Sequence, residues 1–236
     1  MDGMLSQEEI NALLGGMGDS AENTSDVVAN EPTPAAADSN ERLSPEESDA
    51  LGEIANISMG TAATTLSVLV NNRVEITTPK LSYVTLNDLK EQNPAPCVFI
   101  YISYRTGLEG KNILVLKEHD VKVITDLMMG GDGTNTDAEL TDLHLSAISE
   151  AMNQMMGSAA TSMSSMINEK VDISPPSSTR VDLTDTMMED GLHDMVGQTF
   201  VQVSFRMTIG DLVDSEIMQL YPFDFAKLIY TRFRST

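Results

Sequence analysis

The chain of 236 residues is poor in cysteine, in aromatic residues and in positive charge. It has one cysteine, so no internal disulfide can form, and a reducing compartment such as the cytoplasm is expected. Lysine and arginine number 14 against 36 acidic residues, which gives a net charge of −22. A surface of this sign repels nucleic acid and anionic membranes, so we expect neither as a partner. It suits a partner protein that carries basic patches.

Long apolar segments are also missing. No run approaches the roughly 20 residues that a membrane span requires. The first residues, MDGMLSQEEI, lack the basic and apolar regions of a signal peptide. Membrane insertion is therefore not expected. Cys97 lies in the apolar run CVFIYISY and is predicted to be a buried core residue, since a reactive thiol needs a nearby base that the sequence does not show.

Common catalytic and metal-binding patterns are missing too. The three histidines, His119, His144 and His193, are scattered and show no metal-ligand spacing. No glycine loop followed by lysine is present to cradle a phosphate, and no serine–histidine–acid arrangement can be placed. We therefore expect this chain to bind no metal and no cofactor of its own.

What the sequence does contain is a long internal repeat. The same sparse polar pattern occurs twice, 97 residues apart: Asp49, Glu53, Asn56 and Pro79, then Ser146, Glu150, Asn153 and Pro176. Several intervening residues repeat at the same offset. A repeat that retains glutamate and asparagine as well as core residues predicts two copies of one active surface.

The chain is expected to consist of a short peptide, a linker and one folded domain. Residues 1–17 contain a capping box and one apolar helix face, and 18–42 read as a flexible acidic linker. The domain spans 43–236, with repeats at about 43–140 and 141–234. We predict long helices over 44–70 and 141–168, strands over 73–78, 97–104, 112–117, 170–174, 199–208 and 216–220, and shorter helices over 119–129 and 223–233. The regions after 78 and after 174 read as polar loops. The predicted fold is α+β, with two halves sharing one sheet around a pseudo-twofold axis.

Helical geometry indicates where the repeated polar residues point. At 100° per residue, Asp49, Glu53 and Asn56 fall within a stripe about 60° wide, opposite apolar residues such as Leu51 and Leu66. The second helix shows the same division. We therefore expect the polar stripes to face solvent. Small residues beside the stripes are expected to let another molecule approach closely: Gly60, Ala63, Gly157 and Ala160.

A carboxylate and an amide one helical turn apart can perform a limited chemistry. An amide is no general base, but it can hold a water molecule in line with a phosphorus atom. A carboxylate can pair with a lysine on a partner. These two groups suffice for a substrate that brings its own metal and an activated phosphoryl group, because positioning the reactants is then most of the remaining catalytic task. The alternative is that both residues merely decorate an exposed helix, which two copies at one offset disfavour.

Both stretches resemble the pattern of the CheC-type response-regulator phosphatases: Asp or Ser, three residues, Glu, two residues, Asn, twenty-two residues, Pro. The segment LSQEEINALL is also similar to the N-terminal peptide of flagellar switch proteins that captures phosphorylated CheY. This resemblance implies the following partner-binding residues: Leu5, Ser6, Gln7, Glu8, Glu9, Ile10, Leu13 and Leu14. The pairing of such a peptide with a two-site domain resembles the flagellar motor switch phosphatases.

The resemblance implies a specific reaction. The substrate is the aspartyl phosphate of CheY, Asn56 and Asn153 orient the attacking water, and Glu53 and Glu150 contact a lysine of the regulator. The supporting residues are Asp49, Ser146, Pro79 and Pro176. Magnesium is carried by CheY, the fold has three layers, and the location is the cytoplasmic face of the flagellar basal body, among switch-complex proteins. Two alternatives stay open: a rotor subunit that binds CheY-phosphate without hydrolysing it, and an adaptor that works through the peptide alone.

One departure from the resemblance concerns the end of the chain. Flagellar motor switch phosphatases carry a further C-terminal domain similar to the rotor protein FliN, and this chain ends at Thr236. We expect such a domain to be absent from it. Either the sequence is truncated, or this protein does not use that anchor.

Deleting residues 1–17 is expected to raise the apparent KM for phosphorylated CheY and to leave kcat nearly unchanged. Residues 15–42 form a coil that averages about 30 Å end to end, so the peptide holds a captured regulator near the helices at roughly millimolar effective concentration. Steady-state phosphate release measures both constants. A large fall in kcat with an unchanged KM would contradict the tethering role.

Overall fold

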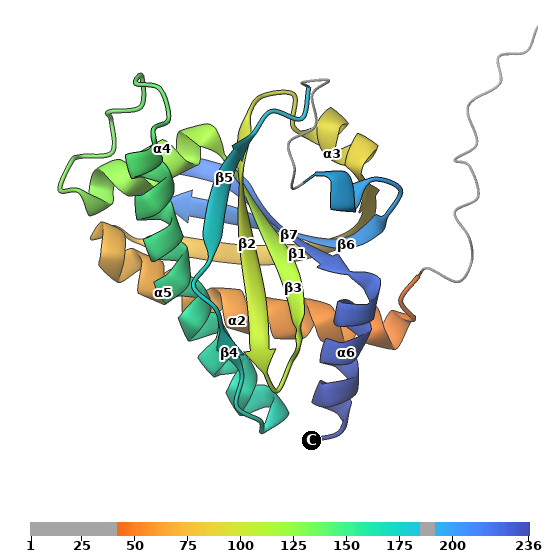
Figure 1. The fold of residues 1–236 in the computed structure, drawn as a ribbon. Coiled ribbons are helices and arrows are strands. Elements are labelled where there is room, and N and C mark those ends of the chain that lie inside the picture. Colours follow the sequence, from red (N-terminus) through yellow and green to blue (C-terminus); the bar gives the residue numbers. More distant parts are fainter. Residues whose placement is uncertain (1–41, 185–191) are drawn as a thin grey trace, which may run out of the picture. The chain divides into compact units, whose positions relative to one another are not determined.

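The structure is a computed structural model that describes residues 42–184 and 192–236. Figure 1 shows its helices, α2 (Pro45–Val70), α3 (Leu86–Gln92), α4 (Glu118–Met128), α5 (Asp142–Ile167) and α6 (Phe223–Arg234), and a short 3-10 helix, η1 (His193–Met195). The strands are β1 (Val74–Thr85), β2 (Cys97–Thr106), β3 (Gly110–Lys117), β4 (Asp172–Ile173), β5 (Ser177–Val181), β6 (Thr199–Ile209) and β7 (Val213–Pro222). The predicted peptide and all but the last residue of the predicted linker lie outside the described residues.

The two repeats share one antiparallel sheet. Its strand order is β1-β6-β7-β3-β2-β4, and β5 also pairs with β2. Strand β1 of the first repeat pairs with β6 of the second, whereas β4 and β5 of the second repeat pair with β2 of the first. Strands β3 and β7 meet at the centre. The order is therefore symmetric about the β3–β7 pair, and the predicted α+β fold with a shared sheet is confirmed.

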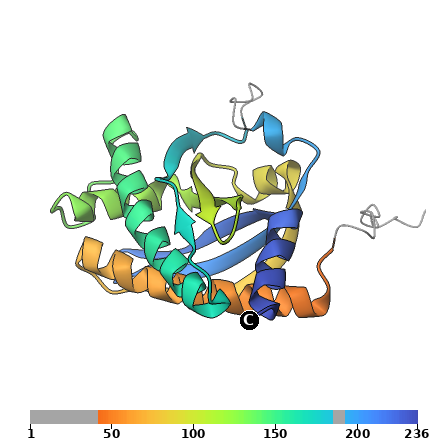
Figure 2. The ribbon, with the colours of Figure 1, turned by 60° about the horizontal axis from the view of Figure 1, so that its bottom comes forward.

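Helices cover the two faces of the sheet unequally (Figures 1 and 2). Helices α2, α4, α5 and α6 contribute to the main hydrophobic core on one face. Helix α3 and η1 contribute to a smaller core on the other face, which includes Leu89, Phe99 and Met195. The domain thus has three layers. Within 42–184 and 192–236, no helix is both long and apolar enough to cross a bilayer.

Local signals in the sequence set the ends of both long helices. Helix α2 begins at Ser44, whose hydroxyl accepts a hydrogen bond from the Glu47 amide in a capping box. It ends at Asn71, which adopts a left-handed conformation with φ 48°. Helix α5 follows Thr141 and ends at Asn168, again left-handed with φ 52°. Asparagine tolerates this conformation better than most residues, so the predicted helix ends are confirmed.

A repeated serine ties each long helix to the strand that follows it. The Ser67 hydroxyl oxygen accepts a hydrogen bond of 2.9 Å from the Val74 amide. The Ser164 hydroxyl oxygen accepts one of 2.8 Å from the Val171 amide. Each serine also donates to a helix carbonyl four residues earlier. This part of the repeat therefore stabilises the fold.

The first predicted polar loop, after Thr78, is wrong. Strand β1 continues to Thr85, with a register shift between Thr77 and Lys80. Thr78 has φ 60°. Pro79 lies in the bulge, where no hydrogen bond between the strands requires a backbone amide at its position. Proline therefore marks a bulge here and does not end the strand. The chain then forms α3, which starts with a capping box between Thr85 and Asp88.

The second predicted polar loop, after residue 174, is wrong as well. Residues Ser177–Val181 form β5, an edge strand paired with β2. Prolines 175 and 176 precede the strand, and proline is tolerated at the start of an edge strand because no amide is needed there. The pairing with β2, distant in sequence, makes this short polar segment a strand.

Cys97 is buried, as predicted. Its side chain is 1% exposed and lies in the smaller core. The sulfur lies 3.8 Å from the Val181 carbonyl oxygen. Burial, helped by the charge of Asp182, raises the pKa of the Cys97 thiol to about 12. The thiol therefore stays protonated near neutral pH.

Replacing Ser67 or Ser164 by alanine is expected to lower the free energy of unfolding by about 1–2 kcal/mol, because a partly buried amide loses its acceptor. Urea denaturation measures the change. The matched control is Ser165→Ala, at an exposed serine whose hydroxyl donates only to a helix carbonyl, and it should stay within about 0.5 kcal/mol of the parent. Equal losses of unfolding free energy for all three variants would contradict the stabilising role of the two serine–amide hydrogen bonds.

The thiol of Cys97 is expected to resist modification in the native protein at pH 8. The raised pKa keeps the reactive thiolate scarce, and burial blocks the reagent. In denaturant the thiol recovers its ordinary pKa and should react quickly. A colorimetric thiol assay with and without denaturant measures both rates, and rapid labelling of the folded protein would show that the strand opens readily.

Candidate functional site

The first predicted site lies along the exposed side of α2. Asp49, Glu53 and Asn56 are all exposed, whereas Leu51 is buried on the opposite side. Strand β1, which packs against α2, carries the half-buried Pro79 at its bulge. The predicted outward direction of the polar stripe is thus confirmed.

The second predicted site lies on α5 beside the start of β5. Ser146 and Glu150 are exposed, Asn153 is half-buried and Pro176 is buried. These four residues line one shallow cavity of about 460 Å³. The fold therefore brings the second glutamate, asparagine and proline together around one space, although the proline lies outside the helix that carries the other three.

Hydrogen bonds hold the wall of this second site in place. The Ser178 hydroxyl donates to the Leu145 carbonyl oxygen at 2.8 Å, and the Ser149 and Ser178 hydroxyl oxygens lie 2.8 Å apart. They fasten β5 to the first turns of α5. Neither serine was predicted, because the matching positions in the first repeat are Gly52 and Leu81. A comparison of where the repeats differ would have pointed to them.

The small residues beside the polar stripes have two different roles. A Cβ atom added at Gly60 or Gly157 would meet nothing within 4 Å, so the helix surface is open at these positions. Ala63 and Ala160 are buried in the main core, and their predicted place on the exposed face is wrong. The reason is that each long helix packs against the strand after it, so its polar stripe is not exposed along its whole length.

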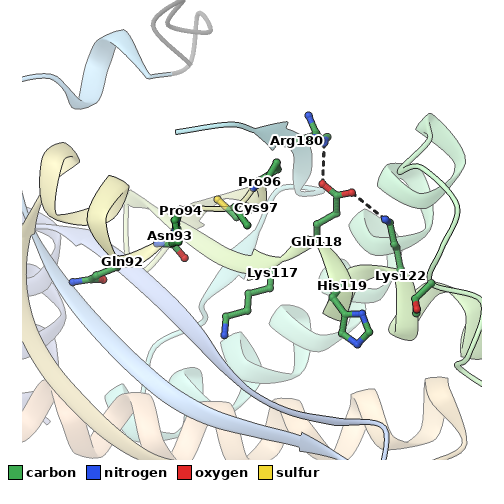
Figure 3. A pocket seen from close by; sticks show the side chains of 12 residues that line it. Gln92, Asn93, Pro94, Pro96, Cys97, Lys117, Glu118, His119, Lys122 and Arg180 are labelled. Atoms are coloured by element: carbon green, nitrogen blue, oxygen red, sulfur yellow. Dashed lines mark hydrogen bonds and ion pairs between the residues drawn. The ribbon is translucent and has the colours of Figure 1, made fainter. Parts of the chain in front are cut away.

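A separate cavity of about 670 Å³ lies at the start of α4 (Figure 3), and no residue of either polar stripe lines it. There Glu118 pairs with Lys122 at 3.1 Å and with Arg180 at 2.9 Å. Burial acts to raise the pKa of Glu118, but the hydrogen bonds from these two cations lower it below its ordinary value. Cys97 also lines this cavity, but its thiol stays protonated near neutral pH and is a poor nucleophile there.

Metal binding by this chain finds no support in the described ranges. In 42–184 and 192–236, no three histidine, cysteine, aspartate or glutamate side chains come together in a way that could hold an ion. That magnesium arrives with the substrate stays a prediction.

A sequence profile of the CheC-like family matches residues 46–83 and 143–180. Each matched segment covers nearly all of a long helix and extends past the repeated proline, which is Pro79 within β1 and Pro176 just before β5. The two matches coincide with the two predicted sites and start 97 residues apart, as the repeat requires.

Individual relatives agree with the profile. The flagellar motor switch phosphatase FliY of Bacillus subtilis (strain 168) is 46% identical over 223 residues, which cover 94% of this chain and 56% of that protein. This chain thus spans just over half the length of that relative. The crystal structure of Thermotoga maritima FliY superposes with a TM-score of 0.74 and 40% identity, over 82% of this chain and 98% of that one. The middle domain of FliM from H. pylori, at 16% identity and a TM-score of 0.60, shares the fold over 80% of this chain and 99% of that one. Since nearly the whole Thermotoga chain is matched at this identity, the protein belongs to the CheC-like family.

Proposed function

We propose that this chain hydrolyses the aspartyl phosphate of the response regulator CheY at the flagellar motor switch. One observation carries the proposal: each long helix displays a glutamate and an asparagine, one turn apart, on a surface that a protein-sized substrate can reach. The name of the Bacillus relative, a flagellar motor switch phosphatase, supports a phosphatase activity and a place at the motor switch.

The asparagine side chains position the attacking water. The carboxamide oxygen of Asn56 or Asn153 accepts a hydrogen bond from the water, and the amide NH₂ is free to donate to a phosphoryl oxygen. Water attacks the phosphorus, the bond from phosphorus to the aspartyl oxygen breaks, and the water's proton leaves with inorganic phosphate. The regulator supplies the activated acyl phosphate and its own magnesium, so holding the water in line is the main task of this chain.

The glutamate side chains recognise the regulator. Glu53 and Glu150 are exposed at the edge of each site, where a carboxylate can accept a charge-assisted hydrogen bond from a lysine of the partner. The chain's net charge of −22 attracts a basic docking surface over a longer range. Both contributions weaken with added salt, because exposed charges are screened.

The competing function is a docking module that binds phosphorylated CheY and hydrolyses nothing. Its fold would be the same, since the FliM middle domain shares this architecture. The water-holding asparagine distinguishes the two functions, because docking alone does not require an amide at both Asn56 and Asn153.

Asn56→Ala or Asn153→Ala alone is expected to leave partial phosphatase activity, and the double variant is expected to lose about 100-fold or more, as misplaced reacting groups do. Phosphate release is measured with CheY, magnesium and a small acyl-phosphate donor. The matched control is Asn135→Ala, the same change at an exposed loop position outside both repeated motifs.

The thermal midpoint of each variant shows whether the fold is retained. Full activity in a folded double variant would eliminate the asparagine mechanism. A parent chain that binds phosphorylated CheY but releases no more phosphate than CheY alone would favour the docking module.

A further inference from the structure

Besides the Asp49/Ser146 difference, the two sites differ at the outward position four residues after the glutamate. This position holds Ile57 on α2 and Gln154 on α5, 97 residues apart. The Ile57 side chain is apolar and 44% exposed. The Gln154 side-chain amide donates a hydrogen bond of 2.8 Å to one carboxylate oxygen of Glu150. One site thus presents an apolar side chain where the other presents a hydrogen-bond donor.

Helix geometry places this position inside the docking surface. Residues four apart on a helix are surface neighbours, so Ile57 lies beside Glu53 as Gln154 lies beside Glu150. Ile57 also follows Asn56 directly. A regulator that contacts the glutamate and reaches the asparagine must therefore cover this side chain.

At the first site, covering Ile57 favours docking. Apolar area removed from water stabilises a complex in proportion to its size. Among the described residues, no hydrogen bond or ion pair joins Glu53 to another side chain. Its carboxylate must therefore be ordered when the regulator arrives, which costs side-chain entropy.

At the second site, the carboxylate that contacts the regulator is already held, so a docked regulator is oriented relative to Asn153. Gln154 fixes one oxygen of Glu150 and leaves the other available for a lysine of the partner. The half-buried Asn153 lies in the cavity whose wall is fastened through Ser178. Less ordering is then required on the way to the transition state.

We propose that the two sites divide the work: Ile57 makes the first site the tighter docking site, and Gln154 positions Glu150 so that the second site turns over faster. The inference rests on the proposed phosphatase function. The partner it requires is a response regulator that carries an apolar side chain next to the lysine that meets the glutamate.

Reciprocal substitutions in single-site chains test the division. Asn153→Ala leaves the first site alone, and adding Ile57→Gln should raise KM for phosphorylated CheY about fivefold through lost apolar burial. Asn56→Ala leaves the second site alone, and adding Gln154→Ile should lower kcat about threefold through lost positioning. Ile57→Gln should also raise kcat of the first site, and Gln154→Ile should also lower KM of the second site, because each change installs the other site's side chain. A merely structural role would not raise both constants in one chain and lower both in the other.

The matched control is Val68→Gln in the chain that keeps only the first site. Val68 is 78% exposed and lies on the same helix, about 16 Å further along at 1.5 Å per residue. This variant should leave both constants unchanged, and thermal midpoints confirm folding. If both single-site chains hydrolyse CheY-phosphate but the exchanges change neither constant, the division is overturned and the phosphatase function stands. If neither single-site chain nor the parent hydrolyses it, both proposals fail.

Discussion

The exchange of outer strands between the two repeats is the constraint on which the rest of the structure depends. Strand β1 hydrogen-bonds to β6, and β2 bonds to β4 and β5, so each repeat completes the sheet of the other. A single repeat would keep only its own hairpin, β2–β3 or β6–β7, and would leave its outer strands unpaired, with their amides and carbonyls exposed. Because each long helix packs against the strand that follows it, this exchange also places both polar stripes. The domain must therefore fold as a whole before either site exists.

The site itself requires little chemistry from this chain. An exposed amide and an exposed carboxylate are ordinary surface groups, and their value lies in their fixed spacing on a rigid helix. The regulator brings the activated phosphoryl group, and the chain contributes orientation and charge. The cavity of about 670 Å³ at the start of α4, with its cations around Glu118, therefore has no part in the proposed reaction.

Much of the fold and the outward direction of both sites could be predicted from the sequence. Capping residues such as Ser44 and Asn71, together with helical periodicity, specify helices locally, and these predictions are confirmed. Strand β5 and the second half of β1 were missed because their pairing partners lie far away in sequence and because prolines marked a bulge and an edge. Gln154 and Ser178 were not predicted, because the prediction rested on residues that the two repeats share and these two positions differ between the repeats.

The central claim is that an asparagine on each long helix holds a water molecule against the regulator's phosphorylated aspartate. The most direct test is a crystal structure of this chain bound to CheY that carries a beryllium fluoride mimic of the phosphoryl group. The account predicts the regulator seated on α2, α5 or both, with the side-chain amide of Asn56 or Asn153 within about 3 Å of a water beside the mimic. A regulator bound to another face, with both amides exposed to bulk solvent, would contradict it.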